Sequence, residues 1–374
     1  MAGIYIHIPF CKKACHYCNF HFSTSLKLKN DFLEALLNEI SLRTPYLNNE
    51  NVSTIYFGGG TPSLLNIEEI QSILDKIHAV YSVRTDAEIT LEANPDDITE
   101  DKLISWKNAG VNRLSIGVQS FFEEDLAWMN RAHTAEQSVH NLLLAKKHFE
   151  NITIDLIYGM PTLSDAKWKQ NVEQAIKAAI THLSCYALTV EPKTALSAMI
   201  KRHELSDVDP NDQARQFLLL MEWMDKAGYE HYEISNFALP TKRSRHNSSY
   251  WQGESYLGLG PSAHSFDGTS RQWNIANNPL YIQSLLNNQL NFEKEVLTPA
   301  QQLNEYIMTS LRTVEGLDTN YVSNRFSNDE ATRIQRSGDE FIRKELLIQK
   351  EKNLILTRQG KLFADGIAAE LFAE

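Results

Sequence analysis

The sequence predicts an α/β fold in which six strands of a parallel sheet alternate with helices through the first half of the chain. Short runs of β-branched and aromatic residues recur there, apolar at nearly every position, as in strands buried on both faces. Each run is followed by a segment with the apolar spacing of a helix. The chain has 374 residues, 43% of them hydrophobic and 22% charged. That length allows one large domain and a smaller one.

The strand–helix units follow one another without a fixed sequence repeat, and both an open doubly wound sheet and a barrel fit them. Gly110 is expected to end the third helical stretch. The expected strands, each paired with the helical residues that follow it, are 3–8 with 28–42, 54–59 with 67–81, 88–94 with 98–110, 113–119 with 123–129 and 134–148, 152–161 with 165–179, and 182–190.

Polar residues or glycine stand at the carboxyl ends of most of these strands: His7, Gly58, Glu92, Gln119 and Tyr158. Ligand sites in parallel α/β folds are built at that edge of the sheet. The sequence therefore predicts a binding site at this edge, whether the sheet is open or closes into a barrel.

The second half of the chain has a different character. A helix is expected near residues 210–227, an irregular aromatic-rich stretch over 231–265, and mainly helices after 298, prominently over 302–318. Near the C-terminus, LLIQ and LILT flank the turn-like KEKN, which predicts a hairpin followed by a helix, as in a winged-helix domain. We therefore expect a large domain at 1–230, an irregular extension at 231–297 and a mainly helical, winged-helix-like domain at 298–374.

Charge and hydropathy restrict the classes of function. With 36 basic and 47 acidic residues the net charge is -11, which argues against a nucleic-acid partner and favours a packing role for the C-terminal domain. No apolar run approaches 18 residues, and the N-terminal MAGIYIHIPF lacks the features of a signal peptide. The cytoplasm is the expected location.

Three of the four cysteines lie within eight positions, in CKKACHYC at residues 11–18. Cys11, Cys15 and Cys18 could bind zinc together with a histidine from this loop, His16 or His21. They could instead hold a [4Fe–4S] cluster whose fourth iron stays open for a small molecule. The loop follows the first strand, at the edge where ligands bind, which favours the cluster. The distant Cys185, in an apolar strand, is expected to be a core residue.

The C-x3-C-x2-C spacing, with Tyr17 before the last cysteine, resembles the signature of the radical S-adenosylmethionine (SAM) superfamily. This resemblance implies that the amino and carboxylate groups of SAM chelate the open iron. It also implies an electron donor that reduces the cluster, and reductive cleavage of SAM to a 5′-deoxyadenosyl radical.

A triple glycine, GGGTP at 58–62, ends the second strand and would let the backbone approach a ligand closely. By the same resemblance this segment binds the SAM amino group, and further strand-end residues contact the cofactor. Singly, each acid or amide could equally cap the next helix. The implied SAM residues are Tyr5, Gly59, Gly60, Thr61, Glu92, Gln119, Arg131 and Asp155.

The segments YIHIPFC, GGGTPS, GVQSF, DLIYGMP and SLRTVEGLD resemble the coproporphyrinogen III dehydrogenase group of that superfamily. The resemblance covers almost the whole chain and implies a partial TIM-like (β/α)6 barrel with a C-terminal domain. The oxidases of this group carry a further cysteine two residues after the third, where this chain has Phe20. They also carry a long N-terminal arm, whereas ten residues precede Cys11 here. Both differences indicate the heme chaperone branch.

HNSSYW at residues 246–251 resembles a heme-binding motif of that branch. It implies that His246 ligates heme iron while Tyr250 and Trp251 pack on the porphyrin, with Lys242, Arg243 and Arg245 near the propionates. The alternative is an ordinary loop whose aromatic residues pack on the barrel. His264, in the glycine-rich GLGPSAHS, receives no role.

The expected function is binding of heme, as cargo, and its delivery to apoproteins such as respiratory enzymes, with transient docking on a membrane. The sequence leaves open whether SAM is turned over. The enzyme alternative is anaerobic oxidative decarboxylation of coproporphyrinogen III to protoporphyrinogen IX.

Overall fold

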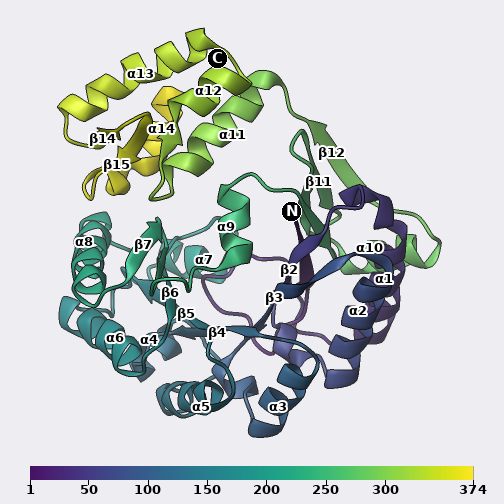
Figure 1. Cartoon of the computed structure of the whole chain (residues 1–374). Coiled ribbons are helices and arrows are strands. Elements are labelled where there is room, and N and C mark those ends of the chain that lie inside the picture. Colours follow the sequence, from purple (N-terminus) through teal and green to yellow (C-terminus); the bar gives the residue numbers. More distant parts are fainter. Residues whose placement is uncertain (374) are drawn as a thin grey trace.

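The computed structural model describes residues 1–373 and contains one twelve-stranded sheet, ordered β12-β11-β10-β9-β1-β2-β3-β4-β5-β6-β8-β7. Its central six strands are parallel and match the six predicted, and they curve into a partial barrel with helices outside (Figure 1). These strands are β1 (Ala2–Ile8), β2 (Val52–Gly59), β3 (Val83–Ala93), β4 (Arg113–Gln119), β5 (Ile152–Tyr158) and β6 (His182–Ala187).

The helices of the barrel begin and end where local sequence signals place them. Asn66 and Glu69 form a capping box at the start of the second helix. Gly110, at φ +100°, follows the end of the third, as predicted. The helices are α1 (Lys29–Leu42), α2 (Ile67–Val80), α3 (Glu100–Asn108), α4 (Glu123–Trp128), α5 (Ala135–His148), α6 (Asp165–Lys177), α7 (Ala195–Lys201) and α8 (Pro210–Lys226), with short 3₁₀ turns at Thr44–Leu47, Pro62–Leu64 and Pro95–Asp97.

The stretch predicted to be irregular is in fact regular and belongs to the same sheet. β8 pairs with β6 in antiparallel orientation and β9 pairs with β1 in parallel orientation. These strands have only three to five residues, too few to show an alternating pattern in sequence. The elements are β7 (Glu230–Glu233), β8 (Asn236–Ala238), α9 (Arg245–Trp251), β9 (Tyr256–Leu259), β10 (His264–Phe266), β11 (Ser270–Asn274), α10 (Asn278–Leu286) and β12 (Phe292–Val296).

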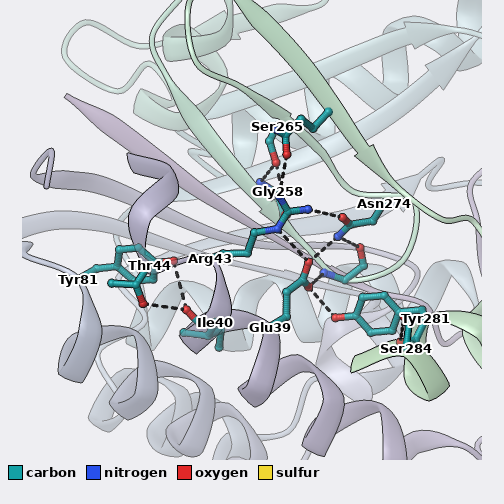
Figure 2. A network of polar contacts seen from close by, with 12 residues as sticks. Glu39, Ile40, Arg43, Thr44, Tyr81, Gly258, Ser265, Asn274, Tyr281 and Ser284 are labelled. Carbon is teal, nitrogen blue, oxygen red and sulfur yellow. Dashed lines mark hydrogen bonds and ion pairs between the residues drawn. The ribbon is translucent and has the colours of Figure 1, made fainter. Parts of the chain in front are cut away.

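A buried polar network ties this added edge of the sheet to α1 (Figure 2). The Glu39 carboxylate accepts hydrogen bonds from the Gly260 amide at 2.8 Å, the Asn274 amide at 2.7 Å and the Tyr281 hydroxyl at 2.6 Å. One turn later, directly after α1, Arg43 donates to Gln272 at 2.6 Å and to Asn274 at 2.9 Å. The Glu39 and Arg43 side chains are 1% and 4% exposed, so β11 and α10 are fixed to the barrel through hydrogen bonds of buried charged groups.

The C-terminal domain has an apolar core of its own and the winged-helix order of elements. The predicted hairpin is present, whereas the helix expected at 302–318 ends at Leu311. Backbone hydrogen bonds from Ile234 to Arg312 and from Val314 to Tyr232 join the domain to the barrel. Its elements are α11 (Pro299–Leu311), β13 (Leu317–Asp318), α12 (Thr319–Arg325), α13 (Asn328–Arg343), β14 (Leu347–Lys350), β15 (Asn353–Leu356), the 3₁₀ turn Gly360–Phe363 and α14 (Ala364–Leu371).

Among the helices of residues 1–373, none combines the length and the apolar character that crossing a bilayer requires.

Candidate functional site

The carboxyl ends of the barrel strands surround a cavity of about 430 Å³. Of the strand-end residues predicted to form a site, Glu92 and Gln119 line this cavity, whereas His7, Gly58 and Tyr158 do not. We call it the barrel cavity. The three clustered cysteines lie on its rim, and its lining extends down to Arg113 and Thr153 inside the barrel. The predicted site residues that line it are Cys11, Cys15, Cys18, Gly59, Gly60, Thr61, Glu92, Gln119, Arg131 and Asp155.

The cysteine loop is held over the barrel by the segment that follows α4. His16 N–H donates to the Met129 carbonyl at 3.1 Å, and the Asn130 side chain donates to the Ala14 carbonyl at 2.7 Å. The three thiols are part-exposed and none forms a disulfide. The loop therefore presents free thiols on a fixed backbone at the mouth of a ligand-sized cavity.

The geometry fits a cluster better than a single zinc ion. One ring nitrogen of each histidine considered as a zinc ligand is hydrogen-bonded: His16 Nδ1 bonds the Trp128 carbonyl at 2.9 Å, and His21 Nε2 bonds Asn278 at 2.6 Å. Within residues 1–373 no three His, Cys, Asp or Glu side chains are grouped so that they could hold one metal ion. Thiolates that bind different irons of a cluster need no such convergence.

The Arg131 guanidinium connects the cysteine loop to the ends of β3 and β4. It donates to Cys15 Sγ at 3.3 Å, to the Asn94 side chain at 2.7 Å and to the Gly117 carbonyl at 2.9 Å. Burial raises the pKa of Cys11 to about 11, and the positive charge of Arg131 opposes this effect. Thiols in this state hold their protons until a metal displaces them, and Arg131 stabilises the thiolates that result.

The glycines after β2 allow a backbone approach that a side chain would prevent. A Cβ at Gly60 would lie 2.6 Å from the Phe10 carbonyl oxygen and 2.7 Å from that of Ile8. Gly59 has φ +102°, which favours glycine. Residues 59–61 thus form a backbone wall directly against the strand that leads into Cys11.

Two carboxyl groups face the cavity from neighbouring parts of the sheet. Burial, and then the charge of Asp155, raise the pKa of Glu92 to about 7, and Tyr56 donates to this carboxyl group at 2.8 Å. Burial also raises the pKa of Asp155 to about 6. Both groups hold protons unusually strongly, and a bound cation would favour their ionised forms.

Tyr5 does not line the barrel cavity. Its ring stacks on Tyr56, with ring centroids 6.1 Å apart, and borders a second cavity described below. Gln119 ends β4 with φ +65°, a conformation that costs energy for a residue with a side chain.

The residues of the predicted heme motif lie in two different environments, the inside of the barrel and a second cavity. His246 is 1% exposed; its Nδ1 bonds Thr54 at 2.7 Å and its Nε2 bonds the Tyr250 hydroxyl at 2.8 Å. Its ring lies near Gly3 and stacks on Tyr56, inside the amino-terminal end of the barrel. The imidazole therefore closes the bottom of the barrel, with no ring nitrogen directed toward a ligand.

Two of the three cationic residues predicted near the propionates are also paired. Arg243 binds Glu230 and Glu315, and Arg245 donates to the backbone carbonyl of Asp86 at 2.6 Å. Tyr250 and Trp251, at the end of the motif, line the second cavity, and Asn247 lines the barrel cavity.

The second cavity, of about 890 Å³, was not anticipated from the sequence. We call it the interdomain cleft, because its lining comes from α9, β9–β11 and the C-terminal helices α11 and α12. Asn19 and Phe20 line both the cleft and the barrel cavity, so the two spaces meet beside the cysteine loop. The aromatic density of 231–265 and the histidine of GLGPSAHS were the sequence signals for it.

Comparisons with known proteins agree with this architecture. Residues 5–175 match the radical SAM superfamily and residues 297–363 match the HemN C-terminal domain. The chain is 31% identical to the heme chaperone HemW of Bacillus subtilis over 378 aligned positions, covering 100% of both chains. It is 33% identical to the heme chaperone HemW of Mycobacterium tuberculosis, covering 99% of this chain and 94% of the relative.

A solved structure of coproporphyrinogen III oxidase (HemN) from Escherichia coli superposes with a TM-score of 0.86 at 24% identity, covering 100% of this chain and 90% of that one. At this identity the likeness establishes the fold. With the matched families and the full-length relatives, it shows that this chain belongs to the radical SAM superfamily, in the group that contains HemN and the heme chaperones named HemW.

Proposed function

We propose that this chain is a heme chaperone that holds a [4Fe–4S] cluster and SAM in the barrel cavity, binds heme, and delivers it to apoproteins such as respiratory enzymes. The observation that carries the proposal is similarity along the whole chain to relatives named heme chaperones, at 31% and 33% identity. Phe20 supports it, because no thiol stands where the oxidases of this group place a further cysteine.

In this proposal each part of the barrel cavity has a defined task. The thiols of Cys11, Cys15 and Cys18 hold the cluster, which supplies an electron to SAM when both are bound. The backbone of 59–61 packs beside the amino acid part of SAM, and Glu92 and Asp155 face its positive charge. Arg131 positions Cys15 and balances the negative charge of the loop.

SAM binding is expected to weaken as the pH falls through 7. SAM carries a sulfonium cation, so it favours ionised Glu92, whose pKa is about 7. Below that pH the Glu92 proton must leave before the cation is bound, which contributes a factor of roughly ten to the rise in the dissociation constant from pH 8 to pH 6, in addition to the proton that the SAM amino group loses when it binds iron. Equilibrium dialysis of radiolabelled SAM against anaerobic holoprotein measures it. Glu92→Gln should bind weakly, and the ratio of its dissociation constants at pH 6 and pH 8 should be about tenfold smaller than that of the wild type; an equal ratio in the two proteins would assign the titration elsewhere.

The chaperone function is tested by titrating purified protein with hemin and then mixing the complex with apomyoglobin as a trap. We expect a shifted Soret band on binding and transfer of heme to the trap. Absence of any spectral change on hemin addition would reject the proposal.

The oxidase alternative is tested on the same preparation. After anaerobic reconstitution, the protein is incubated with coproporphyrinogen III, SAM and dithionite, and the tetrapyrrole is analysed by mass spectrometry. We expect an unchanged mass while SAM binding is demonstrated in parallel. Loss of two carboxyl groups, dependent on Cys11, Cys15 and Cys18, would identify an oxidase instead.

A further inference from the structure

The interdomain cleft has two aromatic walls that face one space. Trp251, Tyr256 and Phe266 line it from the barrel side, and Tyr306, Tyr321 and Phe326 line it from the C-terminal domain. In Figure 1 the C-terminal domain lies across the side of the barrel where α9 and β11 are found. A cavity of about 890 Å³ with aromatic walls suits a large planar ligand, because ring faces stack on a flat conjugated system.

His264 is the histidine of this cleft whose ring is free to bind a metal. Within residues 1–373 neither of its ring nitrogens makes a hydrogen bond, and the side chain is exposed and stacked on Trp273 at 6.1 Å. Of the other two histidines of the cleft, His7 bonds the Tyr5 hydroxyl through Nδ1 at 3.3 Å and the His21 carbonyl through Nε2 at 2.8 Å. His21 bonds Asn278 through Nε2 at 2.6 Å and so, among the described residues, has one free ring nitrogen, where His264 has two. Burial, and then Arg271, lower the pKa of His264, which keeps the imidazole neutral as an iron ligand requires.

The cleft also offers a cation for an acidic group at the edge of such a ligand. Arg271 is paired with Glu305 across the cleft. Arg325, at the end of α12, is exposed and makes no side-chain hydrogen bond or ion pair within the described residues. A guanidinium in this state binds a carboxylate in a forked geometry without first breaking another contact.

The exposed side chain of Phe20 shows that the cleft lies beside the cysteine loop. Phe20 is 66% exposed, unusual for a large aromatic residue, and lines both the cleft and the barrel cavity. A planar ligand in the cleft would cover this ring at one edge and meet the free imidazole of His264 within the same space.

We propose that heme binds in the interdomain cleft with His264 as the axial ligand of its iron and with a propionate on Arg325, and that His246 of the HNSSYW segment is a structural residue rather than the ligand. This inference rests on the proposed heme chaperone function and assigns the heme a site within it.

The test compares hemin with iron-free protoporphyrin IX, because only hemin has a metal to ligate. His264→Ala should weaken hemin binding at least tenfold and remove the Soret band of the histidine-ligated iron, while protoporphyrin IX affinity stays within twofold of wild type. Added imidazole should restore the ligated spectrum in this variant, which a folding defect would not allow. His203→Ala, at an exposed position outside the cleft, is the matched control and should behave as wild type.

Arg325 is tested with the same two probes. Arg325→Ala should weaken hemin and protoporphyrin IX to the same degree, since both carry propionates, whereas Arg336→Ala, an exposed arginine on α13, should change neither. An unchanged hemin affinity and spectrum in His264→Ala would overturn the site while leaving the chaperone function in place. Failure of the wild-type protein to bind hemin would instead reject the proposed function itself.

Discussion

Alanine at Cys11, Cys15 or Cys18 is expected to abolish the iron–sulfur cluster, leaving a colourless protein with an intact fold. The three thiols lie on a loop at the rim of the barrel cavity, outside the apolar core, so their loss removes ligands but little packing. A cluster with one open iron depends on all three remaining thiolates. Iron and sulfide content, visible absorbance and electron paramagnetic resonance after reduction measure the loss, and circular dichroism checks the fold.

Cys185→Ala is the matched control, because this thiol is 1% exposed in β6 and packs in the main core. It should keep full iron content and lose only the small stability that a buried sulfur contributes. SAM affinity should fall at least tenfold in each loop variant, since the cofactor loses the iron that the amino and carboxylate groups would chelate. A loop variant with wild-type iron and sulfide content would contradict the assignment.

The barrel and its cavity could be predicted because their signals are local. Parallel strands buried on both faces carry no charged residue over five or more consecutive positions, and the helices carry their own caps. The order of strands in a parallel sheet brings their carboxyl ends together, so the strand pattern was enough to expect Glu92 and Gln119 at one site, whereas Gly59 was expected through the family resemblance of GGGTP.

The added edge of the sheet and the cleft could not be predicted in the same way. β10 has three residues and exists because its neighbours supply hydrogen-bond partners; Gly258 of β9 lies so close to the His264 backbone that a side chain there would clash. Such pairings depend on tertiary contacts rather than periodicity. The residues that line the cleft come from segments that are distant in sequence, for example Phe20, Tyr256 and Tyr321.

The role expected for His246 shows the limit of a short motif. The HNSSYW pattern predicts a segment that faces a ligand, but in the helix α9 the His246 ring lies beside that of Tyr250, four residues later, and bonds its hydroxyl. In α9 the Glu88 carboxylate accepts the His246 backbone N–H at 3.0 Å, which draws the start of the helix into the barrel. The end of the helix, with Tyr250 and Trp251, remains at the cleft.

Glu39→Gln is expected to reduce the free energy of unfolding by about 3–5 kcal/mol, the usual cost of breaking a buried charged pair. Burial raises the pKa of Glu39, yet the groups that hydrogen-bond to its side chain are all donors: the amides of Gly260 and Asn274 and the hydroxyl of Tyr281. These donors require a carboxylate with two accepting oxygens. Glutamine has one accepting oxygen and turns an N–H toward the others, and it leaves Arg43, whose Nε lies 3.8 Å from the carboxylate, without its counter-charge.

Urea unfolding followed by circular dichroism measures this loss, and Glu222→Gln is the control because its pair with Lys226 is exposed and is expected to contribute little to stability. Equal urea midpoints for Glu39→Gln and Glu222→Gln would show that the network does not hold the added edge of the sheet.

Glu39→Gln should also weaken hemin binding. In β11 the side chains of Gln272 and Asn274 bond Arg43, while Arg271, which precedes them in the strand, lines the cleft. The buried network would then act as the support of the heme site, which couples the stability of this edge to the affinity of the cleft.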